Sequence, residues 1–370
     1  MKRLTFLFFF SHFFILGLFA EDIIVRTAQE LIEIRERVNN PNHEEGTDYS
    51  GSTISLANDI NLEDIDWIPI GTEGRPFRGT FDGKGHWIHN LTVNVVGGIY
   101  AGLFGYIGAG GKVQRVGISS GVVRIKEKTN LDDGCYAGGI AAFSKGTISQ
   151  CANLATIYSY QTQANVGGIV GELDTGGIVE DCYNLGRLYT SKGDESYDNY
   201  LGGIAGASDG QIHRVYVEAQ IEGNTVVNSS GIVANEAFYS VVKNAYYQGN
   251  LTDDEFYYSN EGNENSMLGY ELNGKLNPQD DYRIWSFAEG RLPLLTCMLE
   301  LLKGDVNMDG QVSIADVTAL VNIILGKDNV PPYLYDHVAA NVNEDEGVSI
   351  ADVTALVNII LGKEEEVTLP

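Results

Sequence analysis

The residues with the most specific chemistry lie near the C-terminal end of the chain, in the stretch D-V-N-M-D-G-Q-V-S-I-A-D that begins at Asp305. Oxygen donors occupy positions 1, 3, 5, 7 and 12 of a twelve-residue loop there: Asp305, Asn307, Asp309, Gln311 and Asp316. Calcium takes six to eight hard oxygen ligands, and a glycine at position 6, here Gly310, allows the sharp turn around the ion. Gln311 would contribute its backbone carbonyl. The loop therefore predicts a calcium site.

A second copy of this unit follows 36 residues later. The residues V-S-I-A-D-V-T-A-L-V-N-I-I-L-G-K are identical at 312–327 and 348–363, and their apolar spacing predicts an amphipathic helix after each loop. The second loop offers Asn341, Asn343, Asp345, Gly347 through its carbonyl, and Asp352. Asn341 replaces the first aspartate and Glu346 holds the glycine position, so this loop has one carboxylate fewer. We predict that it binds calcium more weakly.

The duplicated loop and helix, covering 304–363, closely resembles a type I dockerin. The resemblance implies a small all-α, EF-hand-like domain that docks onto a cohesin-like partner protein. Dockerins often contact the partner through loop positions 10 and 11, which here are Ile314 with Ala315 and Ile350 with Ala351. Near-identical halves imply docking in two orientations. The alternative is that the domain folds on calcium and only packs against the rest of the chain.

The stretch V-G-G-I-V-G-E-L-D-T-G-G-I-V-E-D-C-Y-N-L-G-R-L, at 166–188, represents a repeat that fills most of the remaining chain. Its second apolar run aligns at Ile88, Val113, Ile148, Val179, Ile212 and Val242, with spacings of 25, 35, 31, 33 and 30 residues. Three residues on come Leu91, Val116, Cys151, Cys182, Val215 and Ala245, and six further on come Val122, Ile157, Leu188, Ile221 and Leu251. The repeat predicts a parallel β-helix, or solenoid, in which each unit, here called a rung, buries its apolar face against its neighbours.

Glycine pairs recur at the start of each rung, as in G-G-I-A-A at 138–142 and G-G-I-V-G at 167–171. We interpret them as corners, because glycine adopts turn dihedrals that a Cβ resists. No lysine-serine pair follows any copy, so the sequence holds no phosphate-binding P-loop. These repeats, together with W-I-P-I-G-T-E-G-R-P-F-R-G-T-F-D-G-K-G-H-W-I-H-N-L-T-V at 67–93, closely resemble GLUG-motif proteins of gut Bacteroidetes. The resemblance covers roughly 50–300 and implies a secreted or surface protein, without naming a ligand.

Residues 1–20 combine Lys2 and Arg3 with a phenylalanine-rich apolar run, which is typical of a secretory signal peptide cleaved after Ala20. We therefore expect a secreted protein in an extracellular, cell-surface or periplasmic location, with no transmembrane anchor. Removing the signal changes the formal charge from −26 to −28. Such an acidic protein is a poor partner for nucleic acid or anionic membranes and is better suited to divalent cations or neutral glycans.

The predicted domains follow from these patterns. Thr27 to Glu30 forms a capping box before an apolar helical pattern, which predicts a short helix capping the N-terminal end of the coil. We assign 1–20 to the signal peptide, 21–97 to the N-terminal cap and first rungs, and 98–252 to the solenoid repeats. Residues 253–300 are interpreted as a C-terminal cap over the open end, 304–363 as the dockerin-like module and 364–370 as an acidic tail.

Cys151 and Cys182 are expected to be buried thiols in neighbouring rungs rather than a disulfide.

Two classes of function remain open for the solenoid. As a binding or adhesion protein it would present loop tyrosines to a glycan or a protein, and the candidates are Tyr158, Tyr160, Tyr189, Tyr197, Tyr200, Tyr257 and Tyr258. These rings could instead simply cover the coil.

As a polysaccharide hydrolase or lyase the solenoid would need two facing carboxylates, and the candidates are Asp132 with Asp133, Glu172 with Asp174, and Asp194 with Glu195 and Asp198. His86 and His89 show no triad signature in the sequence, so no catalytic residue is assigned.

Overall fold

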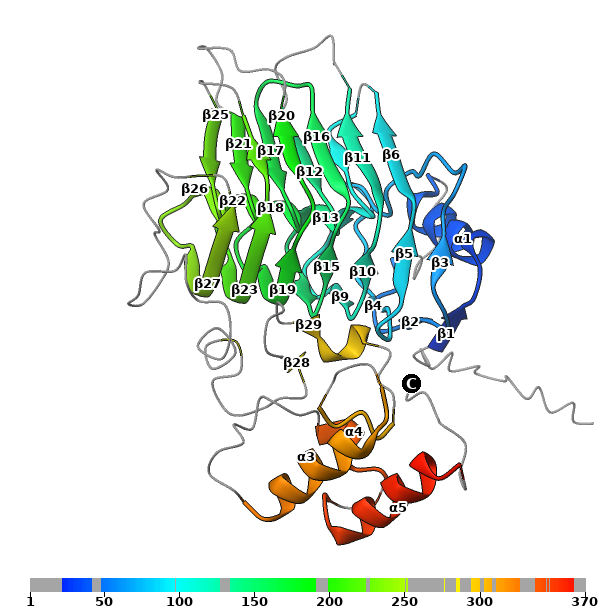
Figure 1. Ribbon diagram of the computed structural model, residues 1–370. Helices are drawn as coiled ribbons and strands as arrows, with labels where there is room; N and C mark the ends of the chain where they lie inside the picture. The colour runs from blue at the N-terminus through cyan, green and yellow to red at the C-terminus, as the bar shows by residue number, and fades with distance from the viewer. Residues whose placement is uncertain are drawn as a thin grey trace, which may run out of the picture.

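The main body of the protein is a parallel β-solenoid of about six turns (Figure 1). The computed structural model describes residues 22–41, 48–96, 98–126, 134–190, 199–223, 227–249, 251, 276, 284–286, 294–299, 303–307, 311–326, 337–343, 345 and 347–362. Corresponding strands of successive rungs pair in parallel, as when Ile157 of one rung lies beside Leu188 of the next. The mainly β solenoid predicted from the repeat is therefore confirmed.

Each complete rung contributes strands to four sheets. The largest contains β1 (Asp22–Val25), β2 (Thr53–Leu56), β3 (Ile60–Asn61), β4 (Thr80–Asp82), β5 (Trp87–His89), β9 (Lys112–Gln114), β10 (Gly117–Ile118), β14 (Thr147–Ser149), β15 (Ala152–Asn153), β19 (Ile178–Asn184), β23 (Gln211–Ala219) and β27 (Val241–Gly249). The second contains β6 (Leu91–Val95), β11 (Gly121–Ile125), β16 (Thr156–Ser159), β20 (Leu188–Thr190) and β24 (Ile221–Glu222). The third contains β7 (Tyr100–Ala101), β12 (Cys135–Gly138), β17 (Ala164–Gly167), β21 (Asn199–Gly202) and β25 (Val227–Ser230). The fourth contains β8 (Phe104–Ile107), β13 (Ala141–Ser144), β18 (Val170–Leu173), β22 (Ala205–Ser208) and β26 (Val233–Glu236).

The glycine pairs join the third sheet to the fourth, as expected of a corner, but for a different physical reason. A Cβ on Gly167 would clash with the carbonyl oxygen of Val170, and one on Gly202 would clash with that of Ala205. Neither glycine has a positive φ. Close backbone approach, rather than an unusual dihedral angle, therefore requires glycine here.

The left-handed corner of each rung lies within the largest sheet and is occupied by residues other than glycine. Their φ angles are 50–52°, and they are Arg115, Gln150, Asp181, Arg214 and Asn244. Two of them bind the preceding rung, because Arg115 pairs with Asp82 and Arg214 pairs with Asp181. The expectation that glycine supplies the turn dihedrals is wrong at this corner, where the polar side chain forms contacts between rungs.

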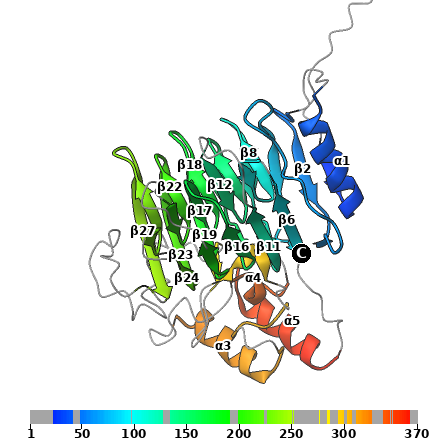
Figure 2. The same cartoon turned by 90° about the horizontal axis from the view of Figure 1, so that it is seen from above.

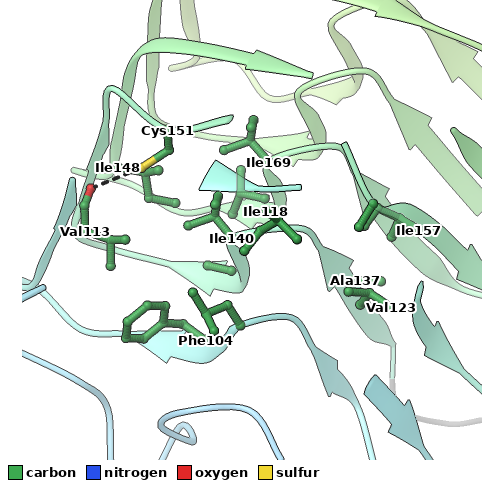
Figure 3. Close-up of a cluster of buried hydrophobic side chains, with 14 of the residues drawn as sticks. Phe104, Val113, Ile118, Val123, Ala137, Ile140, Ile148, Cys151, Ile157 and Ile169 are labelled. Carbon is green, nitrogen blue, oxygen red and sulfur yellow. Dashed lines mark hydrogen bonds between the residues drawn. The ribbon is translucent and has the colours of Figure 1, made fainter. Parts of the chain in front are cut away.

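Apolar side chains fill the interior of the coil, and Figure 3 shows part of this core, with Phe104, Ile140 and Ile169 from successive rungs. In the first ladder, Val113, Ile148, Val179, Ile212 and Val242 pair as predicted, but Ile88 pairs with Ile118 instead. In the third ladder, Val123 lies beside Ile157 and points inward, whereas the predicted Val122 pairs with Thr156. Leu91 lies beside Gly121 and not beside Val116, so it belongs to another row of the core.

Two asparagine side chains inside the coil are hydrogen bonded between neighbouring rungs. Asn153 and Asn184 are fully buried in neighbouring rungs, and Asn153 Nδ2 donates to Asn184 Oδ1 at 2.8 Å. Asn184 also accepts from the N–H of Gly186 and donates to its carbonyl oxygen. Cys151 and Cys182 are buried thiols without a disulfide, as predicted.

Helix α1 (Ala28–Asn39) lies beside β2 at the N-terminal end of the coil (Figure 2). The predicted capping box is present, because Thr27 Oγ1 accepts from the Glu30 N–H and the Glu30 carboxylate accepts from the Thr27 N–H. Leu31 and Val38 are fully buried in the same core as the first strands. The helix thus covers apolar surface that the first rung would otherwise expose.

The described residues between 276 and 299 lie along the side of the coil, whereas we expected this segment to close its open end. They include β28 (Trp285–Ser286), β29 (Leu294–Leu295) and a 3₁₀ turn (Thr296–Met298). Trp285 packs on the outward-facing rings of Tyr183 and Tyr216, and its Nε1 donates to Asp181 Oδ1 at 3.0 Å. These outward tyrosines form the apolar surface that the segment covers.

Three helices follow among the described residues, and they share a separate hydrophobic cluster. They are α3 (Ile314–Ile324), α4 (His337–Ala340) and α5 (Ile350–Ile360). Leu320 of α3 and Leu356 of α5 are fully buried in that cluster. The two predicted amphipathic helices are therefore present. In the part of the chain that the structure describes, no helix is long and apolar enough to cross a membrane.

Candidate functional site

The candidate site is the pair of loops that lead into α3 and α5, and the two loops have the same hydrogen-bond geometry. Asp316 Oδ1 accepts from the Asn307 N–H at 3.0 Å, and Asp316 Oδ2 accepts from the Ser313 N–H at 2.7 Å. Asp352 makes the equivalent bonds to Asn343 and Ser349 at 3.1 and 2.7 Å. Sequence identity between the halves therefore extends to their local structure.

Each helix begins because its loop supplies a cap. Ser313 Oγ accepts from the Ala315 N–H, while Asp316 at the third helical position binds back to the Ser313 N–H, and the second copy does the same. Both aspartates are completely buried. A carboxylate oxygen has more than one lone pair, so each aspartate can hold the loop closed and still accept a further ligand.

The second loop is the more completely described. Asn343 Oδ1 accepts from the Asp345 N–H, Asn343 Nδ2 donates to Asp345 Oδ2 at 2.7 Å, and Asp345 Oδ1 accepts from the Gly347 N–H. Asn341 Nδ2 donates to the carbonyl oxygen of Asp345 at 2.8 Å. These bonds bring the polar side chains of positions 1, 3 and 5 together.

One oxygen in this loop has no partner. Asn341 Oδ1 is buried and accepts no hydrogen bond, which costs free energy unless something else fills the position. It belongs to position 1 of the predicted calcium loop. An amide oxygen is among the ligands that calcium takes, so the orphaned atom fits a cation held at this place.

The first loop is described in part. Asp305 is buried, Gln311 is exposed, and Asn307 is partly buried; the predicted ligand Asp309 lies outside the described residues. Among the described residues, no group of three or more His, Cys, Asp and Glu side chains gathers around one point. In the second loop, whose predicted ligands include two carboxylates, amide side chains and a backbone carbonyl would have to supply part of the coordination.

The predicted partner-binding residues are exposed on the helices. Ile314 is 71% exposed and Ile350 is 69% exposed, and Ala315 and Ala351 beside them are also exposed. Sequence reasoning missed two further apolar side chains, Leu325 and Leu361, which are 62% and 60% exposed. Each follows its isoleucine by eleven residues, about three helical turns, so it lies on the same face. The helical period could have identified both leucines.

Four of the seven candidate ligand-binding tyrosines of the solenoid lie within the described residues. Tyr158 and Tyr189 stack in neighbouring rungs with ring centroids 4.7 Å apart, and Tyr160 lies edge-on to Tyr158 at 4.0 Å. Tyr200 is half-buried in β21. The other three candidates, Tyr197, Tyr257 and Tyr258, lie outside the described residues.

Of the predicted carboxylate pairs, only Glu172 with Asp174 lies within the described residues. Burial raises the pKa of Glu172, and its carboxylate accepts from Asn165 Nδ2 at 2.8 Å. Partial burial also acts to raise the pKa of Asp174, but the Lys145 ammonium at 2.8 Å and the hydrogen bonds from Thr175 together outweigh it and lower that pKa. The pairs at 132–133 and 194–198 fall outside the described residues.

Comparison with known proteins supports the fold. No protein-family model matches the chain. Halomucin of Haloquadratum walsbyi is 33% identical over 102 residues, which are 28% of this chain, and the match spans about 1% of halomucin. A crystal structure from Bacteroides ovatus, described provisionally as an immunoglobulin A1 protease, superposes with a TM-score of 0.50 and 19% identity, covering 74% of this chain and 92% of that one. A second structure, described as IgA1 protease, covers 65% of this chain and 20% of its own, with 17% identity and a TM-score of 0.40. At this level of identity, the Bacteroides ovatus structure supports a shared β-solenoid fold.

Proposed function

We propose that the protein is a secreted or cell-surface binding protein whose solenoid presents a glycan- or protein-binding surface and whose C-terminal loops and helices form a calcium-dependent docking module. The observation that carries the calcium part is the buried, unpartnered Asn341 Oδ1 at position 1 of a loop whose other polar side chains are already gathered. The dockerin resemblance and the exposed isoleucines support docking to a cohesin-like partner.

In the proposed function, calcium binding by the two loops precedes docking. A calcium ion would be held by Asp305, Asn307, Asp309, Gln311 and Asp316 in one loop and by Asn341, Asn343, Asp345, Gly347 and Asp352 in the other. Because Asp316 and Asp352 also cap their helices, filling the loop would stabilise the start of α3 and α5. The exposed apolar residues at those helix starts would then be presented in a fixed orientation.

A reciprocal exchange tests the calcium assignment. Calorimetric titration of the full chain with calcium should show a tighter and a weaker site. Asn341→Asp should tighten the weaker site by adding a carboxylate, whereas Asp305→Asn should weaken the tighter one. Wild-type protein that gives no binding heat at millimolar calcium would contradict the proposal, and so would two variants that shift both sites equally.

The docking surface can be tested with recombinant cohesin modules. If either half can dock, Ile314→Asp and Ile350→Asp should each leave affinity within a few-fold of wild type, since the other half remains available. The double variant should lose binding altogether, because a buried unpaired carboxylate is costly. The charge-matched control for the double variant is Thr318→Asp combined with Thr354→Asp, at exposed positions one turn along α3 and α5. Equal losses from the two double variants would indicate a charge effect instead of a specific contact.

Glycan binding would use the stacked Tyr158 and Tyr189 with Tyr160, because aromatic faces offer flat apolar area to sugar rings. Tyr160→Ala should reduce binding on an array of neutral glycans. Tyr239→Ala, which removes an exposed ring elsewhere on the coil, should not. Equal loss in both variants, or no binding by wild type, would argue that these rings only cover the strands.

A second candidate function is a polysaccharide hydrolase, and the opposite pKa shifts of Glu172 and Asp174 favour it. Glycosidases pair a carboxylic acid that stays protonated with a carboxylate that stays ionised. Release of reducing sugar that disappears in Glu172→Gln would support this function. Activity that survives the substitution would exclude Glu172 as the acid.

A further inference from the structure

Three polar side chains from successive rungs meet on the outer face of the largest sheet. His89 Nδ1 lies 2.5 Å from Ser119 Oγ, and His89 Nε2 lies 3.1 Å from Asp59 Oδ2. Asp59 directly precedes β3, His89 ends β5, and Ser119 directly follows β10. The parallel stacking of three rungs therefore joins residues that are 30 positions apart in the sequence.

The strand register fixes these positions. Ile88 pairs with Ile60 on one side and Ile118 on the other, and all three isoleucines point into the core. Since side chains alternate along a strand, His89 and Ser119 point outward together. The Ser119 N–H also donates to the carbonyl oxygen of Ile88 at 3.0 Å, which ties the serine to the strand beside it.

The hydrogen bonds select one form of the histidine. Asp59 accepts from the Trp87 N–H at 2.9 Å and lies 3.2 Å from His86 Nδ1, so several donors hold its carboxylate. Partial burial acts to raise the pKa of Asp59, but the bonds from Trp87, His89 and His86 outweigh it and lower that pKa. An ionised Asp59 accepts a hydrogen bond from the N–H at His89 Nε2, which leaves the lone pair of Nδ1 facing the Ser119 hydroxyl.

We propose that Ser119, His89 and Asp59 form a surface acyl-transfer site that hydrolyses uncharged esters. A serine, a histidine base and an orienting carboxylate connected in this order are the arrangement that activates a hydroxyl for attack on a carbonyl carbon, and it is identified by geometry and not by sequence position. The side chains of His89 and Asp59 are 38% and 45% exposed, so a substrate can reach them. The formal charge of −26 disfavours anionic substrates.

The reaction balances with water alone. Ser119 Oγ bonds to the ester carbonyl carbon while its proton moves to His89 Nδ1. The bond from the carbonyl carbon to the alkoxide then breaks, and the alkoxide leaves as an alcohol with that proton. Water next loses a proton to His89 and attacks the acyl-serine, and Ser119 takes the proton back as the acid departs. Asp59 is a positioning residue, because it acts only through His89.

Labelling of the full chain with a fluorophosphonate probe tests the proposal, since the probe bonds to an activated serine. Mass spectrometry should place the label on Ser119. His89→Gln should slow labelling about 100-fold, the scale of general-base catalysis. Ser120→Ala is the matched control, because Ser120 is the next residue and its Oγ bonds Asn90 instead of His89; this variant should label as wild type does.

Hydrolysis of p-nitrophenyl acetate gives a second readout. Ser119→Ala should lose turnover, and Asp59→Asn should lower kcat without changing KM, because the substrate does not touch Asp59. Hydrolysis that persists in Ser119→Ala would come from histidine acting directly and would overturn the proposal. Folded wild-type protein that takes no label, or takes it at another residue, would overturn it as well, with circular dichroism confirming the fold of each variant.

Discussion

The solenoid and the C-terminal helices are both built by repetition, but they are held together differently. In the solenoid, each rung pairs its backbone with the next, and the interior holds an uninterrupted apolar cluster. The two C-terminal halves share a small cluster around Leu320 and Leu356, and their loops close over polar side chains, among them Asn341, whose Oδ1 accepts no hydrogen bond. We infer that contacts within the chain are enough to stabilise the first region, whereas the second depends on a bound ion.

Removal of calcium should therefore have the largest effect, and only on one region. An ion present at a thousand times its dissociation constant stabilises the folded form by about 4 kcal/mol. Chelation should abolish the helical signal of α3 and α5 while the β signal and its thermal transition stay unchanged, as measured by circular dichroism and scanning calorimetry. If the helices persist in chelator, the C-terminal region does not depend on a bound ion, and the two regions do not differ in this respect.

Ile148→Ala should instead destabilise the solenoid and leave the C-terminal helices unchanged. Ile148 is fully buried in the solenoid, and such a truncation costs about 2–5 kcal/mol through lost burial and the cavity left behind. The solenoid transition should fall while calcium binding is unaffected. Ile68→Ala at a site that is 57% exposed is the matched control and should change stability by less than about 0.5 kcal/mol.

Asn184→Ala should have a smaller effect. It removes a buried partner of Asn153 Nδ2 and of both backbone groups of Gly186, at a cost of about 1–3 kcal/mol. Asn153 Nδ2 keeps its bond to the Ala155 carbonyl oxygen, and the Gly186 N–H keeps its bond to the Asn153 carbonyl oxygen. Denaturant unfolding should show a lower midpoint with an unchanged slope. Asn58→Ala, at an exposed asparagine, should leave the midpoint in place; a matching decrease there would mean that burial does not set the cost.

Glu172→Gln should have the smallest effect, and its sign should depend on pH. Because burial raises the folded-state pKa of Glu172, the protonated side chain favours folding below its unfolded pKa, and this contribution is lost as pH rises through the folded pKa. The uncharged variant should therefore melt at a slightly higher temperature than wild type at neutral pH and at the same temperature in acid. A variant that melts lower at neutral pH would show that the bond to Asn165 outweighs burial.

Sequence reasoning identified the solenoid because the apolar repeat survives the drift between rungs. It assigned Val122 to the core when Val123 points inward, because two adjacent valines carry the same apolar signal and only strand alternation distinguishes them. It aligned Ile88 with Val113 although Ile88 lies beside Ile118. The spacing of 25 residues, shorter than the other four, was the visible sign of that misalignment.

The candidate sites differ in how far the sequence could predict them. The loops before α3 and α5 are continuous in the chain, so their spacing was enough to predict the helices that follow them. Their calcium ligands stay a prediction. Ser119, His89 and Asp59 come from three rungs, and their meeting depends on the register of β3, β5 and β10. The sequence shows no triad because stacking, and not chain continuity, brings the three side chains together.

The polar corner of the largest sheet has a consequence for assembly. A coil of nearly interchangeable turns could fold with one turn looped out, because the apolar core accepts many neighbours. Arg115 must meet Asp82, however, and Arg214 must meet Asp181, whereas the turn between them presents Gln150 at that corner. Omitting the turn that carries Arg115 would place Gln150 beside Asp82, and omitting the turn that carries Asp181 would place Arg214 beside Gln150. Either error would leave a charged side chain without its partner. The corner thus works as a positional label that distinguishes otherwise similar turns during stacking.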